Sequence, residues 1–306
     1  MKISAFLDCL SPKLEEQFKY AKELKLESIS LRNFDGKKPH QLNDNDVSKI
    51  VDLVREYRIK VALIDTGIER YECYDNASHN VALGKFIKVS NLANKIGALN
   101  ISINLPNFRV ASIQDHSQVR NRINDYAAIT DKAKRILVLE RSKTETGGSF
   151  TVIANELKSK YIGVVYSPEI TVKADDSIST SYRLLKSRTF FVNISDFDDK
   201  FNPQLIGYGN GELIDLFKKL KADNYQNYIN LDCDFSDMIG DINRKTTPKE
   251  RKGFLGFFKG ESKLKITKRN KNFILFKKRL GVKPTAVVTH FMIIEHQIGI
   301  LRKIFN

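Results

Sequence analysis

The chain has few cysteines. Only Cys9, Cys73 and Cys233 occur among 306 residues, far apart and in no Cys-x-x-Cys pair. An odd number of widely spaced cysteines does not form a disulfide framework, so we expect a protein of the reducing cytoplasm. Its 42% apolar residues can supply a core of one large α/β domain or two smaller ones without such staples.

Long apolar runs are also missing. No segment approaches the roughly 18 consecutive apolar residues of a membrane-spanning helix. A strand-like segment, residues 3–7, follows the first residues without a basic region before it. We therefore expect neither a transmembrane helix nor a secretory signal peptide.

Acidic residues are scarce in one part of the chain. Residues 244–306 contain 17 Lys/Arg and 3 Asp/Glu, whereas residues 1–243 contain 34 and 33, so +14 of the net charge of +15 belongs to the C-terminal segment. Residues 244–283 hold 15 basic and 2 acidic residues with five phenylalanines among them. Basic and aromatic residues together can grip single-stranded nucleic acid or an anionic membrane surface. A polyanionic partner at residues 244–283 is one prediction, and a solvated excursion whose phenylalanines dock on the main body is the alternative.

The main body repeats one unit, a β-rich apolar run followed by a segment with helical spacing. The predicted strands are residues 3–7, 28–32, 60–64, 99–103, 136–140, 162–166, 189–194 and 228–231. Ser11 and Pro12 predict the start of the first helix, and Gly97 predicts the end of a helix over residues 81–96. Eight such units favour a (β/α)8 TIM barrel, with an open doubly wound sheet as the alternative.

The pattern changes after residue 235. We predict a barrel body over residues 1–243, a basic extension or long loop over 244–284, and a helix over 285–306 that closes the barrel. Apolar residues at helical spacing, among them Phe291, Ile294, Ile298 and Leu301, favour that last helix.

A barrel builds its site from the C-terminal ends of its strands, and here nearly all of these positions are polar. They are Asp8, Arg32 with Asn33, Asp65, Asn104, Glu140 with Arg141, Ser167 with Glu169, Asn193 with Asp196, and Asp232 with Asp234. Glu140 directly follows the buried run Ile136-Leu137-Val138-Leu139. Clustered carboxylates repel one another unless they share a cation, so the set predicts a divalent ion with oxygen ligands such as Mg²⁺ or Mn²⁺.

A glycine-rich turn follows the seventh strand. Gly207, Gly209 and Gly211 precede a helix that starts near Glu212, and barrels often bind phosphate in this region. The backbone amides of residues 207–211 are thus predicted to hold a phosphate, with a simple tight turn as the alternative. Arg141 and Asn104 are further predicted substrate contacts.

These strand ends resemble a known family. Leu139-Glu140, Val192-Asn193-Ile194-Ser195-Asp196 and the turn from Ile206 to Leu213 are similar to the sugar-phosphate isomerase/epimerase group of xylose-isomerase-like barrels, over about residues 1–235. The resemblance implies one metal ion held by four strand ends, which here are Glu140, Ser167, Asn193 and Asp232. Ser167 and Asn193 stand where the family has an acid and a histidine, and neutral oxygens suit Mg²⁺ better than Zn²⁺.

The chain has only five histidines, and none of them lies at a predicted strand end. Related endonucleases that cut DNA at abasic sites use three zinc ions and many histidines, so the resemblance does not extend to them.

We therefore expect a sugar or sugar-phosphate isomerase/epimerase that moves a proton α to a carbonyl with help from Mg²⁺ or Mn²⁺. The predicted catalytic residues are Glu140 and Asp232, and the predicted metal ligands are Glu140, Asp232, Asn193 and Asp196. The alternative function is a non-catalytic barrel that binds a ligand, or a polyanion through its basic segment.

Overall fold

Eight parallel strands form the centre of the molecule. The computed structural model describes residues 1–246 and 268–305. The strands are β1 (Lys2–Ala5), β2 (Ser28–Leu31), β3 (Lys60–Asp65), β4 (Asn100–Asn104), β5 (Ile136–Glu140), β6 (Ile162–Tyr166), β7 (Thr189–Ile194) and β10 (Tyr228–Leu231). Their order in the sheet is β1-β10-β7-β6-β5-β4-β3-β2, and every paired neighbour runs parallel. The predicted strands are thus all present.

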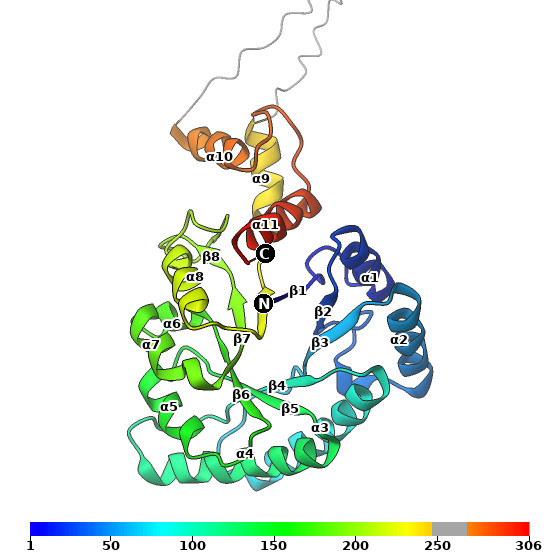
Figure 1. Ribbon diagram of the computed structural model, residues 1–306, viewed down its shortest axis with the longest axis vertical. Helices are drawn as coiled ribbons and strands as arrows, with labels where there is room; N and C mark the ends of the chain where they lie inside the picture. The colour runs from blue at the N-terminus through cyan, green and yellow to red at the C-terminus, as the bar shows by residue number, and fades with distance from the viewer. Residues whose placement is uncertain (247–267, 306) are drawn as a thin grey trace, which may run out of the picture.

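The sheet curls until its two edge strands meet. A bridge between Phe6 and Ser30 joins the ends of β1 and β2, and the hydroxyls of Ser4 and Ser30 lie 2.9 Å apart. Helices surround the strands on the outside (Figure 1). The predicted (β/α)8 barrel is therefore confirmed.

Both faces of the strands are buried, which explains their continuous apolar runs. On β5, Val138 belongs to a small cluster with Phe6, Leu63, Val165 and Phe191, whereas Leu137 and Leu139 belong to the large core cluster that includes residues of the surrounding helices. An alternating strand with one polar face could not fill both clusters.

The helices around the barrel body are α1 (Leu14–Glu23), α2 (Asp44–Tyr57), α3 (Asn76–Ile96), α4 (Ile113–Ala133), α5 (Gly147–Asn155), α6 (Pro168–Lys173), α7 (Ile178–Leu185) and α8 (Leu213–Ala222). Short 3-10 helices cover Pro39–Gln41 and Lys186–Arg188, and a two-stranded hairpin joins β8 (Asp196–Phe197) to β9 (Pro203–Gln204). Among the described residues, no helix is long and apolar enough to cross a membrane.

One predicted helix start is wrong and one predicted end is confirmed. α1 begins at Leu14 rather than after Ser11, because the Leu14 amide donates to Oδ1 of Asp35 at 2.7 Å, a cap supplied by another loop. Gly97 ends α3 with φ of +73°, a left-handed conformation that favours glycine.

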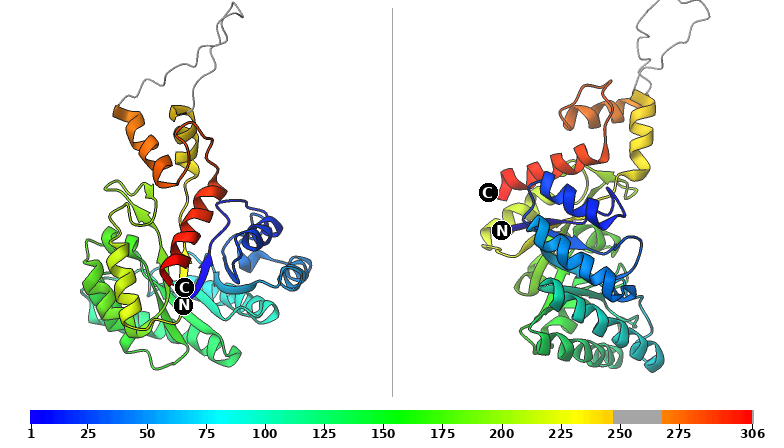
Figure 2. Two further views of the ribbon diagram at one scale, coloured as in Figure 1. Left: turned by 45° about the horizontal axis from the view of Figure 1, so that its top comes forward. Right: turned by 90° about the vertical axis from the view of Figure 1, so that its right-hand side faces the viewer.

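Three helices follow the last barrel strand: α9 (Ser236–Thr246), α10 (Lys268–Arg279) and α11 (His290–Phe305). α11 lies between α8 and α1, since Phe305 contacts Phe217 and Phe291 contacts Tyr20, with ring centroids 5.1 and 5.7 Å apart. It completes the ring of helices, and the two ends of the chain lie close together (Figure 2).

The predicted basic extension is partly helical. α9 crosses the expected boundary at residue 243, and α10 falls inside the stretch predicted as a loop. Phe276 of α10 is buried and contacts Phe235, and the buried Lys277 ammonium donates to the carbonyls of Pro284 and Ala286. Residues 247–267, the middle of the predicted polyanion-binding segment, lie outside the described residues.

Candidate active site at the barrel mouth

A pocket of about 410 Å³ opens at the C-terminal ends of β5, β6, β7 and β10. Its polar lining residues include Glu140, Ser167, Glu169, Asn193, Asp196, Asp232 and Asp234. Most predicted strand-end residues are therefore brought together, as the barrel topology requires. Asn104 pairs in register with Glu140 at the end of β4, but its side chain is exposed and does not line this pocket.

Arg32 joins two strand-end acids. Its Nε donates to both carboxylate oxygens of Asp8, at 2.9 and 3.1 Å, and its Nη1 donates to Oδ1 of Asp232 at 2.9 Å. The guanidinium also stacks on Phe6, 4.3 Å from the ring centroid. Burial acts to lower the pKa of Arg32, but Asp232 and Asp8 raise it overall, so the guanidinium stays charged. The sequence showed these residues at strand ends but gave no sign that they pair.

Glu140 is an acid whose surroundings favour its protonated form. Burial raises the pKa of Glu140, and the negative charges of Asp65 and Asp232 raise it further. The pKa of Asp65 is raised in the same way, by burial first. Burial also raises the pKa of Asp232, although Arg32 opposes this. The mouth thus holds carboxyl groups that can gain or lose a proton nearer to neutral pH than ordinary acids.

Asn193 belongs to a chain of polar side chains that crosses four strands. Its Oδ1 accepts from Nδ2 of Asn230 at 2.9 Å, and Oδ1 of Asn230 accepts from the Ser30 hydroxyl at 2.7 Å. Ser30 in turn meets Ser4. All four residues are buried, so the amide of Asn193 helps to hold β7, β10, β2 and β1 together.

Asp196 fills the glycine turn. Its Oδ2 accepts from the amides of Gly207 and Gly209, and its Oδ1 accepts from those of Gly211 and Phe197, at 2.8 to 3.1 Å. The other amides of the turn, at residues 208 and 210, donate to the carbonyls of Leu205 and Phe197. The predicted phosphate site therefore already holds an anion, the carboxylate of Asp196.

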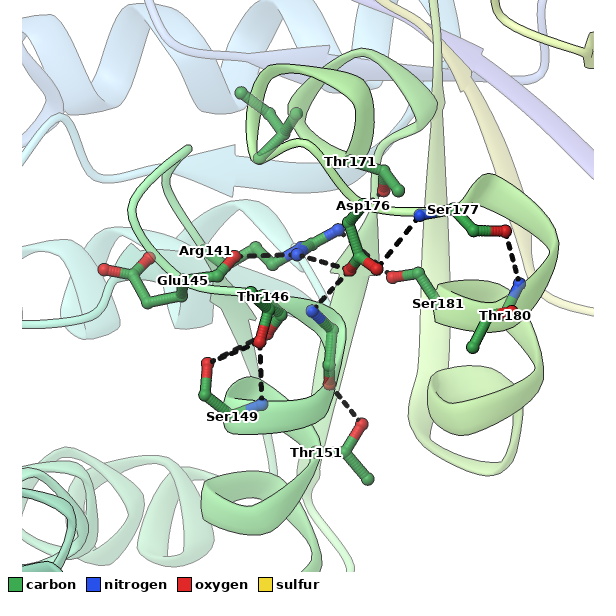
Figure 3. A network of polar contacts seen from close by, with 12 residues as sticks. Arg141, Glu145, Thr146, Ser149, Thr151, Thr171, Asp176, Ser177, Thr180 and Ser181 are labelled. Carbon is green, nitrogen blue, oxygen red and sulfur yellow. Dashed lines mark hydrogen bonds and ion pairs between the residues drawn. The ribbon is translucent and has the colours of Figure 1, made fainter. Parts of the chain in front are cut away.

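Arg141 is buried in a network that ties the loops after β5 and β6 together (Figure 3). Its guanidinium donates to the Glu145 carbonyl at 2.8 Å and to the hydroxyls of Thr171 and Ser181 at 2.6 and 3.1 Å, and it faces Asp176 at 3.5 Å. Asp176 also accepts from the Gly147 amide, at the start of α5. These contacts make Arg141 a support for the pocket wall.

A second cluster lies on the β6–β7 side, and of its members the sequence marked only Glu169, as a strand-end acid. The Ser195 hydroxyl donates to Oε2 of Glu169 at 2.6 Å, and Lys173 pairs with the same carboxylate. The Lys173 ammonium lies 5.0 Å from the ring centroid of Phe201, which lines the pocket from the β8–β9 hairpin. Phe201 has φ of +60° and is 38% exposed, so a strained backbone holds an aromatic ring at the entrance. No sequence pattern marks such a position.

The predicted metal ligands do not fit a divalent ion. Ser167 caps α6 by accepting from the Ile170 amide, Asn193 accepts from Asn230, and Asp196 accepts four amides. Asp232 is paired with a guanidinium, whose positive charge repels a cation. Among residues 1–246 and 268–305, no three His, Cys, Asp or Glu side chains are grouped so that they could hold a metal ion.

Comparison with known proteins finds similar structures but no match by sequence. No family model matches the chain, and no curated protein matches it by sequence. The chain is similar in structure to the 3-keto-D-glucoside 4-epimerase YcjR of E. coli, with 16% identity, a TM-score of 0.60 and coverage of 76% of this chain and 92% of that chain. It is similar to the IOLI protein with a zinc atom bound, with 14% identity, a TM-score of 0.66 and coverage of 76% and 88%.

A third similar structure is the D-allulose 3-epimerase of Methylomonas sp., with 12% identity, a TM-score of 0.69 and coverage of 100% of this chain and 98% of that chain. This chain shares the (β/α)8 fold of these structures. The structural part of the predicted resemblance is confirmed.

Proposed function

We propose that the protein is an isomerase or epimerase of a small sugar, in which Glu140 moves a proton α to a carbonyl. The observation that carries this proposal is the position of Glu140, which lines the same pocket as Asp232 at the C-terminal ends of two barrel strands. A general base works best when its pKa lies near the working pH, and burial shifts Glu140 in that direction. The similar structures that act as sugar epimerases support the same class of reaction.

The proposed step begins when the Glu140 carboxylate takes a proton from the carbon next to the carbonyl. The electrons of the broken C–H bond form an enediolate, and Glu140 becomes a carboxylic acid. Return of this proton to the former carbonyl carbon, together with transfer of the proton of the adjacent hydroxyl to the former carbonyl oxygen, isomerises the sugar. Inversion at the original carbon requires a proton from the opposite face, which Asp232 can deliver after it takes one up from solvent. Burial raises the pKa of Asp232 and favours this uptake, while its pairing with Arg32 acts against it.

The pocket favours an uncharged sugar over a phosphorylated one. Its lining includes the acids Glu140, Glu169, Asp232 and Asp234, and the glycine turn proposed from the sequence to hold phosphate holds Asp196 instead. A volume of about 410 Å³ suits a monosaccharide. Phe201, which is partly exposed and stacks on Phe197, adds an apolar contact to the pocket lining. The proposed reaction uses protein groups alone, because the donor set of the pocket does not fit Mg²⁺ or Mn²⁺.

Proton exchange with solvent tests this function. Wild-type protein incubated in D₂O with a panel of ketoses and aldoses, free and phosphorylated, should introduce deuterium at the carbon next to the carbonyl of at least one free sugar, detectable by NMR. Glu140→Gln should lose this exchange by about a hundredfold or more. Glu23→Gln, on the exposed face of α1, is the matched control and should keep it.

A sugar that binds to wild-type protein but never exchanges would contradict the proposed reaction. That result would favour the non-catalytic barrel, the alternative drawn from the sequence.

A further inference from the structure

The guanidinium of Arg32 binds an acid that the sequence predicts to hold a metal ion. Asp232 is the strand-end acid that the family resemblance assigns to a metal ion, yet here its Oδ1 accepts from Nη1 of Arg32 at 2.9 Å. Arg32 directly follows β2 and reaches Asp8 after β1 and Asp232 after β10, so it draws two carboxylates that follow different strands towards one positive charge. A divalent cation at a barrel mouth has the same effect on its ligands.

Arg32 also has N–H donors that its contacts with Asp8 and Asp232 do not use. A guanidinium has five N–H groups. The contacts to Asp8 and Asp232 engage Nε and one hydrogen of Nη1. Among the described residues, no acceptor lies within hydrogen-bonding distance of Nη2. The side chain is 32% exposed, and its partner Asp232 lines the pocket. A bound metal likewise keeps open positions for substrate oxygens.

We propose that Arg32 is the resident cation of this barrel mouth, standing in for a divalent metal and donating hydrogen bonds to an oxygen of the substrate. When the carbon next to a carbonyl loses its proton, negative charge gathers on the carbonyl oxygen. A guanidinium stabilises such an oxyanion through charge-assisted hydrogen bonds. The role of Arg32 as a hydrogen-bond donor to the substrate rests on the proposed function, whereas the exclusion of the metal by Arg32 does not. The ligand chemistry is that of a neutral hydroxy-ketone or hydroxy-aldehyde.

Mn²⁺ binding, followed by electron paramagnetic resonance, tests the exclusion without any substrate. Wild-type protein should not bind Mn²⁺ at millimolar concentrations at the barrel mouth. Arg32→Gln removes the charge and frees the carboxylates of Asp8 and Asp232, so its affinity for Mn²⁺ should rise about tenfold or more. Adding Asp232→Asn to this variant should abolish the gain.

Two further variants make this test specific. Arg109→Gln, which breaks an arginine–aspartate pair at Asp115 outside the pocket, should gain no Mn²⁺ affinity. Arg32→Lys keeps the positive charge and should exclude Mn²⁺ as wild type does. Comparing its folding with that of Arg32→Gln shows whether the folded protein needs a cation between Asp8 and Asp232. Tight Mn²⁺ binding to wild type that is lost in Asp232→Asn would overturn the proposal.

The substrate role has a separate readout. If a sugar exchanges deuterium, chelator should leave the wild-type rate unchanged. Arg32→Ala should lower kcat by a larger factor than it changes KM, and added guanidine should restore part of the rate lost in this variant. Chelator-sensitive exchange would overturn metal-free function. An absence of exchange with every sugar contradicts the proposed function alone, since the Mn²⁺ measurements still decide whether Arg32 replaces the metal.

Discussion

Single residues set the electrostatics of the mouth, and the ionisation of Glu140 should be visible in the stability of the protein. The folded protein raises the pKa of Glu140, so between about 4.3, the ordinary glutamate value, and the raised value the native state binds more protons than the unfolded chain. This contribution to stability is present below that window and is lost as the pH rises through it. Glu140→Gln should therefore be more stable than wild type above the window, and similar to it at about pH 4.

Melting temperatures of wild type, Glu140→Gln and Glu23→Gln between about pH 4 and pH 9 measure this effect, which calorimetry resolves. The Glu23→Gln curve should follow wild type throughout. A constant difference between Glu140→Gln and wild type at every pH would mean that the ionisation of Glu140 does not oppose folding.

Residue identities could be predicted at this scale, but their partners could not. Each polar strand end follows an apolar run, so the sequence is enough to place Asp8, Arg32, Glu140 and Asp232 at one end of the barrel. Arg32 and Asp232 are separated by 200 positions, and only the closed sheet brings them within 2.9 Å. Local spacing carries no information about such a pair.

At the scale of elements, the turn at residues 207–211 shows how a sequence pattern can correctly predict an anion-binding site and still misidentify the anion. The glycines do present amides to an anion, but the anion is the carboxylate of Asp196 from β8. At Gly209 a Cβ would come within 2.4 Å of Asp196 and 2.5 Å of the Phe197 carbonyl, so the close approach requires glycine. The pattern is explained by packing within the chain.

Asp196→Asn should destabilise this turn. The side-chain NH₂ group of the asparagine would face backbone N–H groups that in wild type donate to the second carboxylate oxygen. The position is only 1% exposed, so water cannot replace the lost hydrogen bonds. We expect a loss of about 2 kcal/mol or more in the free energy of unfolding, measured by urea denaturation. Asp52→Asn, an exposed position on α2, is the control and should change it little. Equal effects of the two substitutions would show that the buried carboxylate is not what holds the turn.

At the scale of the whole molecule, the basic segment divides into a helix that belongs to the folded body and a stretch that composition alone describes. α10 is anchored through Phe276 and Lys277, so a deletion that includes it would remove buried contacts. Residues 247–267 contain six Lys/Arg and two Asp/Glu. Replacing this stretch with a short Gly/Ser linker is therefore the better test of the predicted polyanion partner.

Wild-type protein should be retained on heparin at low salt, and its affinity should fall by orders of magnitude between roughly 50 and 200 mM salt, because each phosphate or sulfate neutralised releases a counterion. The linker variant should melt at the wild-type temperature but lose much of this retention. Retention that does not depend on salt, or that survives the replacement, would argue against a polyanion site in residues 244–283.

The closure of the barrel has a consequence for the protein as it is being synthesised. The ladder of β1 is formed with β10, from Lys2 opposite Tyr228 to Ala5 opposite Leu231, whereas the backbone of β1 is joined to β2 by the isolated bridge at Phe6 and Ser30 and forms no ladder with it. At about 5–20 residues per second, a ribosome needs on the order of 10–50 s to reach β10 after β1 has been made. For that time β1 has no ladder partner of its own. Translation speed and chaperones that cover nascent apolar strands should therefore govern the yield of folded protein more than the local propensity of any strand.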